Sequence, residues 1–218
     1  MQIDISKAFD YENGFYLASQ QQRIGKFAAH LELFRKVSDV AGEIVECGVY
    51  KGASLSRFIK FRAVFENPFS KKIIAFDTFG AFPEAHYEPD KAKRDQFIEE
   101  GGPNSISKEE LADILKKLDL YENIELIEGD VLLTIDEYKK KNKQLKISLL
   151  HIDVDLYEAT KACLEGLYPM MTKGGIVILD DYNKFAGATK AIDEYFSGRS
   201  IRIQKLPYSG AVSFIEIR

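Results

Sequence analysis

Short apolar runs alternate along this chain with longer amphipathic segments. Five of these runs have the length and composition of buried strands, and they cover residues 43–49, 71–76, 123–127, 146–152 and 175–179. Apolar residues recur at helical spacing within 53–65, 108–118, 157–170 and 186–196. Apolar strands that alternate with helices predict a mostly parallel sheet with helices on both faces.

The two ends of the chain extend this alternation. Residues 15–37 form one long helical pattern, of one or two helices, before the first strand. Residues 200–205 and 211–217 are two further strand candidates joined through Pro207 and Gly210, and they predict an antiparallel hairpin. A length of 218 residues fits one domain with an elaboration.

The segment 78–107 interrupts the alternation. It contains three prolines, a Gly-Gly pair, several aromatic residues and His86. It is too long for an ordinary connection, so we expect a lid or a substrate-binding loop. A surface insertion without a role is the alternative.

Composition and charge exclude several classes of protein. Thirty basic and 34 acidic residues give a net charge of −4, which argues against a nucleic-acid-binding protein. No apolar stretch reaches the roughly 18 residues of a membrane span, and the first ten residues lack a secretory-signal pattern. Cys47 and Cys163 lie in apolar runs, which predicts two buried free thiols in a cytoplasmic protein.

Acidic residues occur where the five predicted strands end. They are Glu46, Asp77, Asp130, Asp153 and the pair Asp180-Asp181. The carboxyl ends of parallel strands share one edge of the sheet, and ligands bind at that edge. Helix capping or chance explains one such residue, but five in succession predict a ligand site.

The first strand and its turn indicate how a ligand would be held. Gly48 permits a tight turn, and Gly52 lets the next helix begin against the ligand. The spacing differs from Gly-x-Gly-x-x-Gly, which disfavours a nicotinamide-dependent dehydrogenase. Asp77 is placed to accept hydrogen bonds from two ribose hydroxyls, although a helix cap is an equal alternative. Asp130 is placed to accept from an adenine amino group.

Four sequence strings together resemble the macrocin O-methyltransferase family, within the class I S-adenosylmethionine-dependent methyltransferases. The strings are VECGVYKG (45–52), FDTF (76–79), HIDVDLY (151–157) and GGIVILDDY (174–182). The resemblance covers about residues 42–196 and is weak over the first 40. Members of this family methylate sugar hydroxyls on natural products and use a divalent cation.

The resemblance implies an α/β fold, with a Rossmann-like, seven-stranded, mostly parallel sheet, helices on both faces and a C-terminal antiparallel hairpin. An N-terminal helical segment (1–41) would precede a methyltransferase domain (42–218) that carries the lid-like insertion. The implied cofactors are S-adenosylmethionine and Mg²⁺. The implied partners are a small sugar-containing acceptor and further copies of the chain, with no nucleic acid and no membrane. The acceptor could be a natural-product glycoside, a nucleotide sugar or a polysaccharide unit.

The resemblance also assigns residues to the cofactor and the metal. The residues assigned to S-adenosylmethionine are Glu46, Gly48, Tyr50, Gly52, Ser54, Asp77, Thr78, Asp130, Val131 and Asp153. The implied Mg²⁺ ligands are Asp153, Asp180 and Asp181. The residues themselves favour a cation there, because clustered carboxylates repel one another and hard oxygen ligands suit Mg²⁺.

The remaining site assignments concern the base and the acceptor. Asp153 or Asp155 is the candidate base that accepts the hydroxyl proton. His86, Tyr157 and Tyr182 are assigned to the acceptor.

Several other polar and aromatic residues have plain structural explanations. His151 shares a strand face with Asp153 and either supports the site or is a core histidine, and the role of His30 is open. Arg23 and Lys26 are expected on a solvated helix face. Tyr11, Phe15 and Tyr16 are expected in the core more often than in a pocket wall.

Other functions remain open on the sequence alone. A catechol-like phenol could replace the sugar at the same three-carboxylate site. A cofactor-binding module that has lost catalysis is the non-enzymatic alternative.

Overall fold

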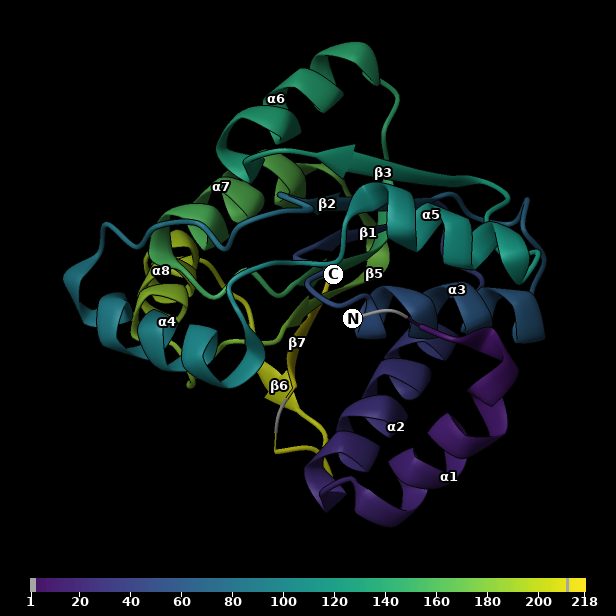
Figure 1. The fold of residues 1–218 in the computed structure, drawn as a ribbon. Coiled ribbons are helices and arrows are strands. Elements are labelled where there is room, and N and C mark those ends of the chain that lie inside the picture. Colours follow the sequence, from purple (N-terminus) through teal and green to yellow (C-terminus); the bar gives the residue numbers. More distant parts are fainter. Residues whose placement is uncertain (1–2, 211) are drawn as a thin grey trace.

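The computed structural model describes residues 3–210 and 212–218, and it confirms the predicted fold class (Figure 1). Seven strands form one sheet in the order β3-β2-β1-β4-β5-β7-β6. The strands are β1 (Glu43–Cys47), β2 (Ile73–Asp77), β3 (Ile124–Glu128), β4 (Ile147–Ile152), β5 (Met171–Leu179), β6 (Gln204–Lys205) and β7 (Ser213–Glu216). Strands β1 to β5 pair in parallel, and β7 is antiparallel to both β5 and β6.

Helices cover both faces of the sheet. They are α1 (Ala8–Ala18), α2 (Gln21–Lys36), α3 (Ala53–Phe65), α4 (Glu88–Gly101), α5 (Lys108–Lys117), α6 (Val131–Lys141), α7 (Tyr157–Leu167) and α8 (Ala186–Phe196). Two short 3-10 turns, η1 (Ile5–Lys7) and η2 (Tyr168–Met170), complete the elements. Helices α2, α3 and α5 form one apolar core with the sheet, and α6, α7 and α8 form the other.

The central strands are continuous apolar runs because each of them supplies both cores. In β1, Ile44 packs in the core under α2 and α3, whereas Val45 and Cys47 pack in the core under α6 and α7. Successive side chains of a strand point to opposite faces, so both sets of positions must be apolar. Cys47 and Cys163 are buried free thiols, as predicted.

The N-terminal segment differs from its prediction. The helical pattern of residues 15–37 belongs to two helices, and the chain breaks between them at Ser19 and Gln20. Helix α1 has no buried residue, so the expectation that Tyr11, Phe15 and Tyr16 lie in the core was wrong. The aromatic spacing was that of a helix, but all three aromatic side chains remain exposed.

The C-terminal hairpin is shorter than predicted. Strand β6 has only two residues, because the register pairs only Gln204 and Lys205 with β7. Residue 211, the predicted start of the last strand, lies outside the described residues, as do residues 1 and 2. Strand β5 begins at Met171, four residues before the predicted start.

The insertion 78–107 contains a helix that the sequence pattern did not predict. Helix α4 carries Pro89 in its first turn and has few apolar residues, so its periodicity is weak. Its Asp90 is fully buried and accepts hydrogen bonds from the backbone N–H groups of Gly187 (2.7 Å) and Tyr157 (3.1 Å). The insertion is therefore attached to the first turns of α7 and α8, and α4 lies beside α8 in Figure 1.

Candidate active site

A pocket of about 630 Å³ lies at the carboxyl ends of the parallel strands. Twelve of the predicted site residues line it. They are Gly48, Tyr50, Ser54, Asp77, Thr78, His86, Asp130, Val131, Asp153, Asp155, Asp180 and Asp181. The topology thus brings acidic residues that are up to 104 positions apart, from Asp77 to Asp181, to one pocket.

The turn after β1 brings the ends of β1 and β4 into close contact. Gly48 has a φ of +91°, and a Cβ atom there would lie 1.8 Å from the carbonyl oxygen of Asp153. Only glycine fits this position, because both the backbone angle and the space exclude a side chain. Gly52 has a φ of +83° and precedes the first turn of α3. It does not line the pocket, so its contribution is to the shape of the turn.

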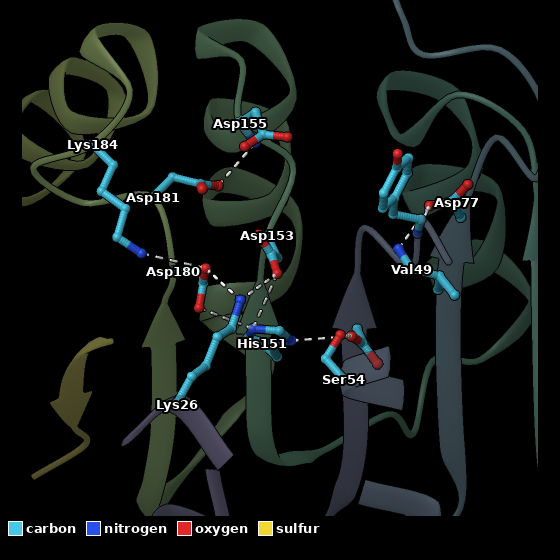
Figure 2. A network of polar contacts seen from close by, with 12 residues as sticks. Lys26, Val49, Ser54, Asp77, His151, Asp153, Asp155, Asp180, Asp181 and Lys184 are labelled. Carbon is cyan, nitrogen blue, oxygen red and sulfur yellow. Dashed lines mark hydrogen bonds and ion pairs between the residues drawn. The ribbon is translucent and has the colours of Figure 1, made fainter. Parts of the chain in front are cut away.

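Asp77 fixes the glycine turn as well as lining the pocket. One carboxylate oxygen accepts from the backbone N–H groups of Val49 (2.7 Å) and Tyr50 (3.0 Å), as Figure 2 shows. The other oxygen accepts from the N–H of Phe79 at 2.7 Å. The hydroxyl of Thr78 also donates to this oxygen, over a longer distance of 3.4 Å. A carboxylate offers about four acceptor positions, so a ribose hydroxyl would have to replace the Thr78 hydroxyl.

Glu46 lies beneath the pocket floor and not in its wall. It is fully buried, accepts a hydrogen bond from the Ser54 hydroxyl, and lies 3.2 Å from Nδ1 of His151. The assignment of Glu46 to direct cofactor binding is therefore corrected, since no polar atom of it reaches the pocket. Its position supports Ser54 and His151 from below.

His151 connects Glu46 to the acidic residues of β4 and β5. Its Nε2 atom is 3.8 Å from Asp153 and 3.9 Å from Asp180. Burial by itself would lower the pKa of His151, but the contacts with Asp180 and Glu46 outweigh burial and raise the pKa to about 9. A protonated imidazole that bridges three carboxylates supports the site and is more than a core histidine.

Three carboxylates gather at the ends of β4 and β5. Oxygen atoms of Asp153, Asp155 and Asp181 lie within 4.8 Å of one another. Asp155 has a φ of +61°, and its N–H donates to Asp181 Oδ2 at 2.9 Å. Burial, followed by repulsion from Asp153, raises the pKa of Asp155 to about 7. Burial and the neighbouring carboxylates also raise the pKa of Asp181. This concentration of oxygen donors and negative charge fits a hard divalent cation such as Mg²⁺.

Asp180 does not belong to this group of three. It lies in a second group with His30 and His151, and its Oδ2 atom is 2.7 Å from Lys26 Nζ. Burial would raise the pKa of Asp180, but Lys26 and His151 outweigh it and hold the pKa far below its ordinary value. The carboxylates gathered by the fold are therefore Asp153, Asp155 and Asp181, where the resemblance had implied Asp153, Asp180 and Asp181.

Lys26 is a site residue that the sequence reasoning missed. Its side chain is only 15% exposed, and Nζ lies 2.7 Å from Asp180 and 3.3 Å from Asp153 (Figure 2). Burial would lower the pKa of Lys26, but these two carboxylates outweigh it and raise the pKa. The expectation of a solvated helix face was wrong for Lys26. The sequence did contain a signal that Lys26 faces inward. Ala29 and His30, which are buried, follow Lys26 by three and four positions and so lie on the same helix face.

His30 is buried beside His151 and does not reach the acidic group of three. Its ring stacks on Phe58 at 5.1 Å and lies 5.0 Å from the ring of His151. Burial, with the nearby charges of His151 and Lys26, lowers the pKa of His30 well below its ordinary value. His30 is therefore a neutral packing partner of His151.

The predicted acceptor residues are not all at the pocket. His86 lines it, but Tyr157 and Tyr182 do not. The hydroxyl of Tyr157 donates to Glu194 at 2.7 Å, and that of Tyr182 donates to Asp193 at 2.9 Å. Both tyrosine side chains point toward α8, because acidic residues of that helix accept these hydrogen bonds. The assignment of Tyr157 and Tyr182 to the acceptor is therefore corrected.

Tyr50 links the glycine turn to the insertion. Its hydroxyl donates to the carbonyl of Gly101, and its ring lies 5.1 Å from the ring of Phe97. Its own carbonyl accepts from the N–H of Ile106 at 2.7 Å. The insertion and the turn therefore form one connected wall of the pocket.

A parallel sheet with an antiparallel last strand, a glycine turn after β1 and acidic strand ends together define a Rossmann-like methyltransferase fold. The chain belongs to the macrocin-O-methyltransferase (TylF) family, which it matches over residues 14–206. The predicted resemblance is thereby confirmed.

Solved structures share this fold over almost the whole chain. The crystal structure of CalS11, a calicheamicin methyltransferase, is 29% identical, with a TM-score of 0.79 over 99% of this chain and 86% of that chain. The O-methyltransferase NovP is 22% identical and has a TM-score of 0.72 over 89% of this chain and 81% of its own. At that identity NovP supports the fold alone.

Two curated relatives come from Streptomyces. One is the 8-demethyl-8-(2,3-dimethoxy-alpha-L-rhamnosyl)-tetracenomycin-C 4'-O-methyltransferase of Streptomyces olivaceus, 26% identical over 66% of this chain and 54% of that protein. The other is the demethyldecarbamoylnovobiocin O-methyltransferase of Streptomyces niveus, 28% identical over 72% of this chain and 59% of that protein. The matches thus span little more than half of either relative.

Proposed function

We propose that this protein is an S-adenosylmethionine-dependent O-methyltransferase that methylates a sugar hydroxyl with the help of Mg²⁺. The observation that carries the proposal is the group of carboxylates from Asp153, Asp155 and Asp181 beside the glycine turn of β1. Family membership supports a methyl transfer, and the rhamnosyl group in the name of the Streptomyces olivaceus relative supports a sugar acceptor.

The cofactor is proposed to lie along the carboxyl ends of four neighbouring strands. Asp130 and Val131 after β3 would contact the adenine, and Asp77 with Thr78 after β2 would contact the ribose. The turn from Gly48 to Ser54 would surround the amino-acid portion. This order follows the strand order β3-β2-β1-β4, so one extended ligand can reach all of these groups at once.

The chain's own residues supply a base and its support. When bound, Mg²⁺ would lower the pKa of a sugar hydroxyl and orient it toward the methyl group. Asp153 or Asp155 would accept the hydroxyl proton as the new O–C bond forms and the C–S bond breaks, with the electron pair kept by sulfur. The pKa of about 7 for Asp155 applies without the cation, because burial and repulsion from Asp153 cause it, and a bound Mg²⁺ would lower it. His151 would hold Asp153 and Asp180 in place.

Calorimetric titration with S-adenosylmethionine and S-adenosylhomocysteine, with and without Mg²⁺, tests the proposal first. We expect micromolar binding of both nucleosides, followed by methyl transfer to glycosides or nucleotide sugars in an acceptor screen. No binding of either nucleoside would contradict the methyltransferase proposal. Turnover of catechols without turnover of glycosides would keep the proposed cofactor but replace the sugar by a phenol as the proposed acceptor.

Self-association of the chain is also expected from the resemblance, and light scattering measures it.

A further inference from the structure

We propose that Arg57 of α3 and Arg23 of α2 bind the α-carboxylate of the methionine portion of S-adenosylmethionine. The inference rests on the proposed function and adds two residues to its cofactor site. Arg23 was expected on a solvated helix face, and Arg57 belongs to no sequence motif.

Both arginines line the pocket, and they approach it from different helices. Helices α2 and α3 pack against each other, and α3 begins directly after the glycine turn. Arg57 lies three residues after Ser54, so the two residues share one face of the first turns of α3. The guanidinium groups of Arg23 and Arg57 form no hydrogen bond or ion pair with any residue that the structure describes.

The two guanidinium groups lack a counter-charge of their own. Arg57 is half-buried, and its pKa is lowered by burial and by repulsion from Arg23. Glu46 is the largest attractive charge on Arg57, but Ser54 and His151 already contact it. Arg57 is partly removed from water, whereas Arg23 is exposed, as expected. Two neighbouring cations at one pocket wall favour an anionic ligand, and guanidinium groups match a carboxylate by paired hydrogen bonds.

The direction of the cofactor along the sheet identifies that anion. If the adenine lies at the end of β3 and the ribose at the end of β2, the amino-acid portion reaches the junction of β1 and β4. Ser54 and Asp153 flank this junction in Figure 2. Asp153 is 23% exposed and can accept from the ammonium group, whereas the arginines on the α2 and α3 side meet the carboxylate. The two charges of the amino acid thus face opposite charges of the protein.

The test compares two ligands that differ in the amino-acid portion. S-adenosylhomocysteine carries the carboxylate, and 5′-methylthioadenosine lacks both it and the ammonium group. We expect Arg57→Gln and Arg23→Gln each to weaken S-adenosylhomocysteine binding about tenfold, which equals about 1.4 kcal/mol. Binding of 5′-methylthioadenosine should change less than twofold. Arg57→Lys should recover part of the loss because it retains the charge.

Arg35→Gln is the matched control on α2, because Arg35 is exposed and lies over the ring of Phe65 away from the pocket. It should bind both ligands as the unmodified protein does. Equal weakening of both ligands by the Arg23 and Arg57 variants, or of neither, would overturn the inference. An unchanged affinity for S-adenosylhomocysteine with a raised KM for an anionic acceptor would assign the arginines to the acceptor instead. Failure of the unmodified protein to bind S-adenosylhomocysteine would refute the proposed function itself.

Discussion

Lys26 shows how one side chain can change the electrostatics of a site. Four aspartates lie at the ends of β4 and β5, and Lys26 reaches Asp153 and Asp180 from a helix more than 120 residues away in sequence. Asp180 therefore has a lowered pKa, whereas Asp155 and Asp181 have raised ones. Charge remains uncompensated at Asp155 and Asp181, on the side of the cluster where a divalent cation is proposed.

Replacing Lys26 by methionine removes the positive charge nearest to that cation. We expect Lys26→Met to lower the melting temperature without metal, since it leaves Asp180 with less compensation, at a cost of about 1–3 kcal/mol. Mg²⁺ should bind several-fold more tightly to the variant, and a saturating concentration should recover part of the lost stability. Thermal melts and calorimetry with Mg²⁺ measure both effects. Equal or weaker Mg²⁺ binding would contradict the prediction.

Asp181 tests the role of the carboxylate group in turnover. Asp181→Asn, like Asp180→Asn, should reduce turnover at least a hundredfold, because each change removes a charge that the proposed cation or Lys26 requires. Binding of S-adenosylhomocysteine should persist, since neither residue is assigned to it. Asp136→Asn on the exposed face of α6 is the control. Unchanged turnover in the Asp181 variant would argue against a metal-assisted reaction.

At the scale of elements, one buried carboxylate attaches the insertion to α7 and α8. Asp90 of α4 accepts from N–H groups in the first turns of α7 and α8, where the helix dipoles favour a negative charge. Neither α7 nor α8 has a side-chain cap of its own. Asp90 therefore caps two helices from a distance, and it fixes the insertion that carries His86.

Asp90→Asn should destabilise the protein by about 1–3 kcal/mol, because the amide retains only one acceptor oxygen for two buried N–H groups. Gly187→Ala should have a similar effect, since a Cβ there would lie 1.8 Å from Asp90 Oδ2. Urea unfolding measures both changes. Asp95→Asn on the exposed side of the same helix should be neutral within about 0.5 kcal/mol. If the Asp90→Asn variant is as stable as the Asp95→Asn control, the hydrogen bonds of Asp90 to α7 and α8 do not contribute to the free energy of unfolding.

An ion pair connects strand β3 with Lys72, the residue directly before strand β2. Glu125 of β3 lies 2.5 Å from Lys72 Nζ and accepts from the hydroxyl of Tyr138 on α6. Burial opposes ionisation of Glu125, but Lys72 and Tyr138 outweigh it and lower the pKa. A lowered carboxyl pKa stabilises the folded state above the unfolded pKa of about 4.3. This stabilisation is lost as the pH falls through the folded value.

Glu125→Gln should therefore cost stability at pH 7 and cost less as the pH falls. The pair is about one-third exposed, so we expect about 0.5 kcal/mol at pH 7. The difference from the unmodified protein should stay constant above about pH 5.5 and decrease as the pH falls below about 4.3, toward the folded pKa. Urea unfolding at several pH values measures it. A difference that stays constant with pH would assign the effect to packing.

At the scale of the whole molecule, the pocket joins both halves of the sheet. Its lining comes from the strand ends on both sides of β1, from α2 and α3, and from the insertion. A ligand that contacts all of these parts binds only the folded chain. Saturating S-adenosylhomocysteine at about 100 times its Kd should add about 2.7 kcal/mol, or about 5–10 °C in melting temperature. A shift below 2 °C would mean that the ligand does not bind selectively to the folded chain.

Much of this architecture could be predicted from local pattern. The bounds of α3 and α8 match their predicted ranges, and each of the five parallel strands overlaps its predicted run. These elements are apolar enough to fill both cores, so their periodicity is clear. Helix α4 was missed because it has no continuous apolar face, and its only buried residue is Asp90. Tyr157 and Tyr182 were misplaced because hydrogen bonds to α8 decide where their hydroxyls point.

The pattern of residues along the chain was enough to predict the fold class and the edge of the sheet at which the acidic residues meet. That follows because strand periodicity and parallel connection are local properties, and because parallel strands place their carboxyl ends on one edge. Which charges face one another became known from the folded arrangement alone: Lys26 lies against Asp180, Asp155 against Asp181, and Arg23 beside Arg57. Those pairings depend on side-chain directions from elements far apart in the chain, and no spacing along the sequence encodes them.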